Sequence, residues 1–166
     1  MLIHCGGIMV KSKISWCFRL KDGLNITEPN TRLADSYRDE ARNSLLRAEK
    51  NFEDNDLLWT TVVIYYAEYY ALYSFLQKIG IKCENHTCSI AAVTELLCEE
   101  KTRTINDHKN KRIDAQYYMR VDKKGEVEQM LREAQMVVAM FDEMISNLSD
   151  EKIERYRTIM KKFSVL

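Results

Sequence analysis

The stretch LLWTTVVIYYAEYYALYSFL, residues 57–76, decides the fold class. It is long enough to cross a bilayer as a helix. Glu68 nevertheless lies near its centre, where a carboxylate is costly in lipid, and its five tyrosine hydroxyls all need hydrogen-bond partners. A stretch that is apolar on every side but carries such groups is typical of the central helix of a soluble bundle. We therefore predict a helical protein with no membrane span.

Helical periodicity continues on both sides of this stretch. Apolar residues recur every three or four positions over residues 33–52 and again over residues 127–148. Gly80 suits the left-handed conformation in which many helices end. Side chains that can cap helix starts stand before three of the expected helices: Asn30 or Thr31, Asn55 and Asp56, and Ser149 and Asp150. The sequence therefore predicts an all-α antiparallel bundle of about five helices, followed by a C-terminal helix.

The first thirty residues have a different pattern, and we expect an N-terminal extension over residues 1–30 before a bundle over residues 31–166. Within residues 13–26, apolar and polar side chains alternate and an Asp-Gly pair favours a turn, which indicates a hairpin. The same apolar residues also fit one face of a short helix, so both interpretations stay open. Met9 is a second candidate for the natural start of the chain.

The composition excludes some classes of protein. Lysine and arginine number 25, as do aspartate and glutamate, so the chain carries no net charge. A generally basic nucleic-acid coat and an acidic disordered tail are therefore not expected. Five glycines and one proline among 166 residues are few loop formers, which favours a helical bundle over a sandwich or barrel.

The five cysteines are an odd number in a chain that is large enough to fold without disulfides. We interpret them as reduced thiols of a cytoplasmic protein. Cys83-x-x-His86-x-Cys88 resembles a cluster of metal ligands, but no second C-x-x-C accompanies it and the spacing fits no established zinc site. Buried thiols are therefore expected in this segment, and neither a metal nor a cofactor is predicted.

Charge is unevenly distributed along the neutral chain. Residues 101–124 contain eight lysines and arginines against three aspartates, whereas residues 125–154 contain two basic residues against eight acidic ones. The basic segment suits phosphate binding, and it equally suits a solvated helix face beside acidic neighbours. Lys109, Arg112 and Gln116 would share one face of a helix, and we expect the neighbouring face with Tyr117 to pack into the core.

Three segments, in this order and at this spacing, resemble HEPN domains (higher eukaryotes and prokaryotes nucleotide-binding). They are YYAEYYALY at residues 65–73, GIKCENH at residues 80–86 and RIDAQYY at residues 112–118. The resemblance covers about residues 31–148. It is strongest to a small stand-alone prokaryotic branch, often archaeal, whose fourth helix carries R-x-x-A-D-Y. Gln116 stands where that motif has its aspartate, so an acid–base role at this position is not expected.

The resemblance assigns roles to individual positions. It marks four motif or structural residues: Glu68, His86, Asp114 and Tyr117. Together with the basic segment, it indicates four candidates for nucleotide or RNA binding: Lys109, Lys111, Arg112 and Gln116. His86 has a family-like position at a helix start, where capping or a bond to the central helix is the ordinary role. Arg112 would either offer its guanidinium fork to phosphate or pair with a carboxylate such as Glu68 to hold the bundle.

The resemblance also implies activities. Many HEPN proteins are metal-independent ribonucleases with an R-x(4–6)-H motif, often toxins of toxin–antitoxin pairs, in which the arginine holds the scissile phosphate and the histidine is general acid or base. Arg103 and His108 match this motif here. Matches of this kind are frequent by chance, and on one unbroken helix the two side chains would point about 140° apart. They would converge only if a helix began between them or if a second subunit completed the site.

Other HEPN proteins are partners of small nucleotidyltransferases or bind nucleotides, and HEPN domains commonly pair through their helices. We therefore expect a cytoplasmic, homodimeric accessory protein that binds nucleotide or RNA and works with a nucleotidyltransferase supplied in trans, without contact to a membrane. A metal-independent ribonuclease of the toxin type is the first alternative. An oligomeric helical scaffold without a ligand is the second.

Overall fold

The computed structural model describes residues 8–165, which fold into seven helices and two three-residue strands. The elements are α1 (Ile8–Arg19), β1 (Leu24–Ile26), α2 (Thr31–Glu53), α3 (Leu57–Lys78), β2 (Ile81–Cys83), α4 (His86–Leu97), α5 (Glu99–Tyr118), α6 (Lys124–Ser146) and α7 (Asp150–Ser164). The predicted all-α bundle of about five helices with a C-terminal helix is confirmed. No helix in this part of the chain is both long enough and apolar enough to cross a membrane.

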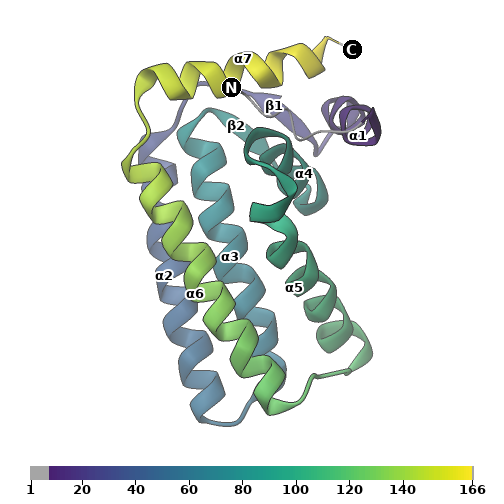
Figure 1. Cartoon of the computed structure of the whole chain (residues 1–166), viewed down its shortest axis with the longest axis vertical. Helices are drawn as coiled ribbons and strands as arrows, with labels where there is room; N and C mark the ends of the chain where they lie inside the picture. Colours follow the sequence, from purple (N-terminus) through teal and green to yellow (C-terminus); the bar gives the residue numbers. More distant parts are fainter. Residues whose placement is uncertain (1–7, 166) are drawn as a thin grey trace.

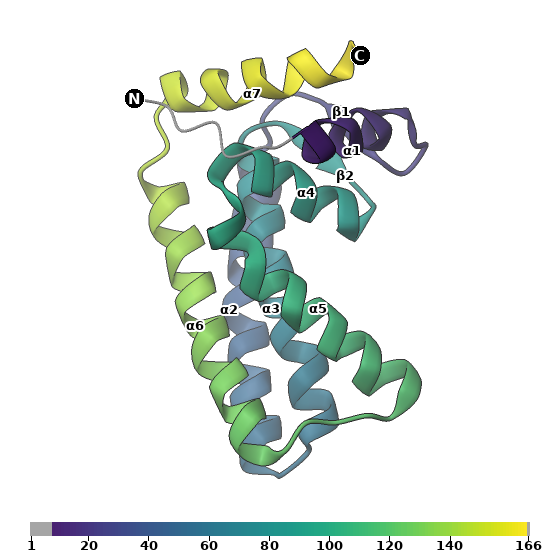
Figure 2. The ribbon, with the colours of Figure 1, turned by 45° about the vertical axis from the view of Figure 1, so that its right-hand side comes forward.

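The long helices α2 and α6 pack lengthwise against the central α3 (Figure 1). Helix α5 lies against α3 as well, but it leans away from α3 and α6 toward its C-terminal end (Figure 2). Helix α7 lies across one end of these helices, where α1, α4 and the small sheet also gather. The molecule therefore has a packed end, formed by the short elements, and an end where α5 stands apart.

The helices begin at the polar residues that the sequence indicates. Asn30, Asp56 and Ser149 each accept the backbone N–H of the residue three positions later, which satisfies a donor that the first helical turn leaves unpaired. Gly80 follows the end of α3 with φ of +73°, as expected for a left-handed helix end. A Cβ at Gly80 would also lie 2.1 Å from the guanidinium of Arg157. A side chain has no room there.

Arg157 fixes α7 across the end of the bundle. Its side chain is buried and donates hydrogen bonds to the carbonyls of Thr27 (2.6 Å) and Ile79 (3.1 Å). These carbonyls belong to the segments that follow β1 and α3, so one guanidinium joins three parts of the chain.

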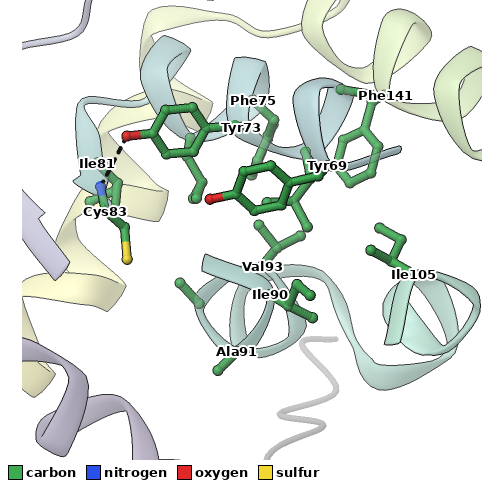
Figure 3. Packing of buried hydrophobic residues seen from close by; sticks show 14 of the residues in the cluster. Tyr69, Tyr73, Phe75, Ile81, Cys83, Ile90, Ala91, Val93, Ile105 and Phe141 are labelled. Carbon is green, nitrogen blue, oxygen red and sulfur yellow. Dashed lines mark hydrogen bonds between the residues drawn. The ribbon is translucent and has the colours of Figure 1, made fainter. Parts of the chain in front are cut away.

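Helix α3 is buried along nearly its whole length and meets α4, α5 and α6 in one apolar core (Figure 3). Its tyrosines find the hydroxyl partners that burial requires. The hydroxyl of Tyr73 accepts the backbone N–H of Cys83 in β2, and that of Tyr69 bonds the hydroxyl of Ser89 in α4. The central tyrosines thus combine apolar packing with polar ties to the neighbouring elements.

The N-terminal segment adopts the helical alternative. Residues 13–19 belong to α1, which buries Ile14 and Cys17 on one face, and the Asp-Gly turn then leads into β1. Strand β1 pairs antiparallel with β2, with Leu24 opposite Cys83. The hairpin interpretation is wrong because the strand partner of β1 comes from a distant segment, which local alternation cannot reveal.

Cys17 and Cys88 form a disulfide that joins α1 to α4, with a Cα–Cα distance of 5.6 Å. The prediction that all cysteines are reduced is therefore wrong, because packing of α1 on α4 brings together two thiols that are 71 residues apart. Cys83 and Cys98 are free, and Cys5 lies outside the described residues. No metal-binding group of His, Cys, Asp and Glu occurs in the described chain. Disulfides are rare in cytosolic proteins, apart from those of hyperthermophiles, so the bridge weighs against the predicted cytoplasmic location.

Candidate anion-binding site

A polar pocket of about 300 Å³ lies where α3, the start of α4 and the middle of α5 meet. The residues that line it are Tyr65, Tyr66, His86, Thr87, Lys109, Arg112 and Ile113. Three sequence candidates, His86, Lys109 and Arg112, are thus brought together although they come from two helices. The size is at the lower end of the range for small-molecule sites.

Lys109 and Arg112 are the two cations of this pocket. The ammonium of Lys109 donates to the hydroxyl of Thr87 (3.1 Å), and the guanidinium of Arg112 donates to the hydroxyl of Tyr66 (2.6 Å). Neither has a carboxylate at ion-pair distance among the residues that the structure describes. Burial lowers the pKa of Lys109, and the charge of Lys13 lowers it further. An anion in the pocket would supply the missing counter-charge.

Arg112 is held by aromatic rings rather than by an acid. Its guanidinium carbon lies 5.7 Å from the ring centre of Tyr65, 5.3 Å from that of Tyr66 and 5.7 Å from that of Tyr117. Its Nε is buried and has no hydrogen-bond partner. The alternative in which Arg112 pairs with Glu68 is wrong, because Glu68 bonds a histidine on α5 instead. Arg112 therefore keeps donor capacity for a ligand.

His86 is the first residue of α4 and closes one side of the pocket. Its ring stacks on Tyr69, with ring centres 3.8 Å apart, and its Nδ1 lies 2.7 Å from the hydroxyl of Tyr65. Burial lowers the pKa of His86, and the charges of Arg112 and Lys109 lower it further. Burial raises the pKa of Tyr65, so the phenol keeps its proton and donates it to Nδ1. The neutral imidazole then carries its own hydrogen on Nε2.

The N-terminus of α4 adds to the positive potential of the pocket. Asn85 satisfies the N–H groups of Cys88 and Ser89, the first with its side chain and the second with its carbonyl. The N–H groups of His86 and Thr87 have no partner within the described chain. Free N–H groups at the positive end of a helix dipole favour negative charge.

The sequence-matched pair Arg103 and His108 does not converge. Helix α5 runs unbroken from Glu99 through both residues, so they point to different sides of it. Arg103 is exposed, whereas the side chain of His108 is only 2% exposed. The described chain therefore does not assemble an R-x4-H site from these two residues.

His108 instead forms a buried network with two carboxylates. Its Nδ1 lies 2.8 Å from Glu68 on α3, and its Nε2 lies 3.1 Å from Glu133 on α6. Burial alone would lower the pKa of His108, but the bonds and charges of Glu68 and Glu133 outweigh it and raise this pKa. We therefore assign His108 as an imidazolium that ties α5 to both neighbouring helices.

The remaining sequence candidates lie outside the pocket. Lys111 pairs with Asp122, Gln116 is partly buried with an unpartnered Oε1, and Asp114 is exposed. Tyr117 is 65% exposed, so the expectation that its helix face packs into the core is wrong. Helix α5 leans away from α3 toward its C-terminal end (Figure 2), and Tyr117 belongs to the last turn of α5.

Sequence reasoning missed four pocket residues: Tyr65, Tyr66, Thr87 and Ile113. The two tyrosines belong to the central helix, where aromatic residues are normally core. Thr87 follows His86 at a helix start, and that position could have signalled an anion site had the contact with α5 been foreseeable.

Comparison with known families places this site in context. The model of the HEPN domain matches residues 34–144, which is more than half of the chain. The chain belongs to the HEPN family. No curated protein and no solved structure matches it. All seven pocket residues of this HEPN protein fall inside the matched region, whereas α1, β1 and α7 lie outside it.

Proposed function

We propose that this HEPN protein binds a phosphate group of nucleotide or RNA in the pocket between α3, α4 and α5. One observation carries the proposal: Lys109 and Arg112 face the same pocket, and neither has a carboxylate partner in the described chain. A partly buried charge without a counter-charge has an unfavourable desolvation free energy, and a bound anion would offset it for Lys109 and Arg112.

The donor set suits phosphate in particular. Arg112 presents a planar fork, Lys109 a point charge, and the start of α4 two free N–H groups beside the hydroxyl of Thr87. These groups have different geometries, and a tetrahedral anion with several acceptor oxygens can bond several of them at once. The neutral His86 adds one more donor at Nε2.

The proposal includes an accessory role for a homodimer beside a nucleotidyltransferase supplied in trans. This part rests on the family and on the likeness to the branch with R-x-x-A-D-Y. It predicts that affinity purification of the full chain at native abundance recovers a nucleotidyltransferase, and that the recovered pair has a fixed stoichiometry. Purification of the chain without any such enzyme would remove this part of the proposal and leave the phosphate site intact.

The phosphate site is tested by calorimetry with ATP and by fluorescence anisotropy with a labelled single-stranded RNA. Arg112→Ala and Lys109→Ala should each weaken binding by about 1 kcal/mol or more, since each removes a charge-assisted contact. Arg103→Ala is the matched control, because it removes an exposed cation from the same helix away from the pocket. Equal affinities of the Arg112 and Arg103 variants for both ligands would refute the site.

Cleavage of RNA is a second candidate function, favoured by the position of His86. His86 of α4 lines the same pocket as Arg112 of α5, so these two residues form an arginine–histidine pair across two helices. This pair would take the place of Arg103 and His108. Arg112 would hold the phosphate. His86, in the tautomer that donates its Nδ1–H to the Tyr65 oxygen, would take the proton of the attacking hydroxyl at Nε2 and give it to the leaving oxygen. This function predicts RNA cleavage that persists with chelator, is lost in His86→Ala and Arg112→Ala, and survives in Arg103→Ala.

A further inference from the structure

Large exposed apolar side chains cluster at one place on this surface. Tyr117, Tyr118, Met119 and Val121 follow one another at the end of α5, with exposures of 65%, 63%, 71% and 37%. Exposed apolar residues elsewhere, such as Leu46 on α2, do not form such a run along the chain. A cluster of this kind marks an interaction site.

The end of α5 is shaped so that both tyrosine rings lie beside a guanidinium. Met119 has φ of +54° and ends the helix, and the N–H groups of Met119 and Arg120 both return to the carbonyl of Asp114. After this turn, the guanidinium of Arg120 lies 5.6 Å from the ring centre of Tyr118. The guanidinium of Arg112 lies beside the ring of Tyr117. Each of the two exposed rings therefore carries a cation on part of its surface.

Arg112 connects this cluster to the anion pocket. Its guanidinium lies 5.7 Å from the ring centre of Tyr117 and at the same time bonds the hydroxyl of Tyr66 inside the pocket. The order along α5 is therefore Lys109 and Arg112 in the pocket, then Tyr117 and Tyr118 outside it. Phosphate-binding groups and flat rings follow one another within about two and a half helical turns.

We propose that Tyr117 and Tyr118 form a base-stacking platform for single-stranded nucleic acid whose phosphate lies in the pocket. The inference rests on the proposed phosphate site. It narrows the ligand of that site from any nucleotide to a single strand of at least two nucleotides. Aromatic rings beside a positively charged groove bind such strands, since every base has a face that stacks. The cations favour this occupant over a protein partner, because Arg112 and Arg120 have no carboxylate partner in the described chain and a strand supplies a phosphate at each step.

Asp114 is the exposed carboxylate on this part of α5. It precedes Tyr118 by four residues and so lies on the same helix face, whereas Asp122 is neutralised by Lys111. A strand that passes over Tyr118 would be repelled by Asp114. Asp114→Asn should therefore strengthen RNA binding modestly, up to about twofold at low salt.

The test is fluorescence anisotropy with a labelled single-stranded RNA hexamer, with AMP binding measured in parallel. Tyr118→Ala should weaken hexamer binding at least fivefold, the lower end of one lost base stack, and leave AMP binding unchanged. Tyr118→Phe should bind like the wild type, because the ring is retained. Leu46→Ala is the matched control for loss of an exposed apolar side chain.

The outcomes separate this inference from the proposed function. If Arg112→Ala loses both ligands but Tyr118→Ala keeps hexamer affinity, the phosphate site stands and the platform is wrong. If neither variant changes either affinity, both proposals fail. If Tyr118→Ala and Met119→Ala abolish self-association in sedimentation while hexamer affinity is unchanged, the cluster is an interface between copies and the platform is overturned.

Discussion

His108 and His86 lie on neighbouring helices, and their surroundings are opposite in charge. His108 is bonded by both Glu68 and Glu133, so its proton is retained and the imidazolium has its counter-charge within the protein. His86 lies beside Arg112 and Lys109 and bonds a phenol, so its ring stays neutral and the two cations remain unpaired. The bundle supplies His108 with carboxylate partners from its own side chains and gives Lys109 and Arg112 none among the described residues. That contrast separates a structural network from a binding site.

The largest expected effect follows from removing the structural histidine. His108→Ala leaves Glu68 buried without its partner, and loss of one member of a buried pair costs about 3–5 kcal/mol. Urea unfolding should show this loss, with Arg103→Ala on the same helix within about 0.5 kcal/mol of the wild type. A loss below about 1 kcal/mol for His108→Ala would contradict a structural role for the network.

The disulfide supports the anion-binding pocket, because Cys88 lies two residues after His86. Cys17→Ser should lower the free energy of unfolding by about 2–4 kcal/mol, since the bridge restrains a long loop in the unfolded chain. Cys98→Ser, which changes a free thiol, is the control. Equal unfolding midpoints of wild type and Cys17→Ser in the absence of reductant would show that the bridge does not contribute.

Stability should depend on pH in the direction set by the network. The folded-state pKa of His108 is raised above its ordinary value near 6.5, so the folded protein holds this proton more tightly than the unfolded chain. The stabilisation is fully present below pH 6.5 and is lost as pH rises through the folded pKa. Burial also raises the pKa of Glu68, which acts in the same direction. Urea midpoints from pH 6 to 9 should fall in the wild type and fall less in His108→Gln.

A smaller effect distinguishes the two rings directly. In an NMR titration the imidazole of His86 should have a pKa below 6.5 and that of His108 a pKa above it. Arg112→Ala should raise the pKa of His86, because a neighbouring positive charge is removed, and should leave His108 unchanged. Indistinguishable titration curves for the two rings would contradict the proposed contrast.

The helices could be predicted from the sequence because their signals are local. Residues such as Asn30, Asp56 and Ser149 act on N–H groups three positions away, and apolar periodicity identifies the buried faces. The disulfide and the pairing of β1 with β2 could not be predicted, since each joins segments more than fifty residues apart.

The candidate site could be predicted only in part for the same reason. Lys109 and Arg112 share a helix face by simple spacing, and that face does line the pocket. The identity of the histidine beside them depends on how α4 packs on α5, which brings His86 in and turns His108 to the interior. Spacing places Tyr117 on the same helix face as Ile113, but it does not give the point at which α5 leaves the bundle, and Tyr117 is exposed.

The salt dependence of RNA binding tests the central claim most directly. Phosphate contacts release counterions, so the logarithm of the affinity for a single strand falls with the logarithm of salt by about 0.7 per contact. The slope for Arg112→Ala should therefore be smaller than that of the wild type by about 0.7, while the slope for Arg103→Ala stays at the wild-type value. Equal slopes for the wild type and Arg112→Ala would show that this guanidinium does not contact phosphate, which would contradict the account of the pocket.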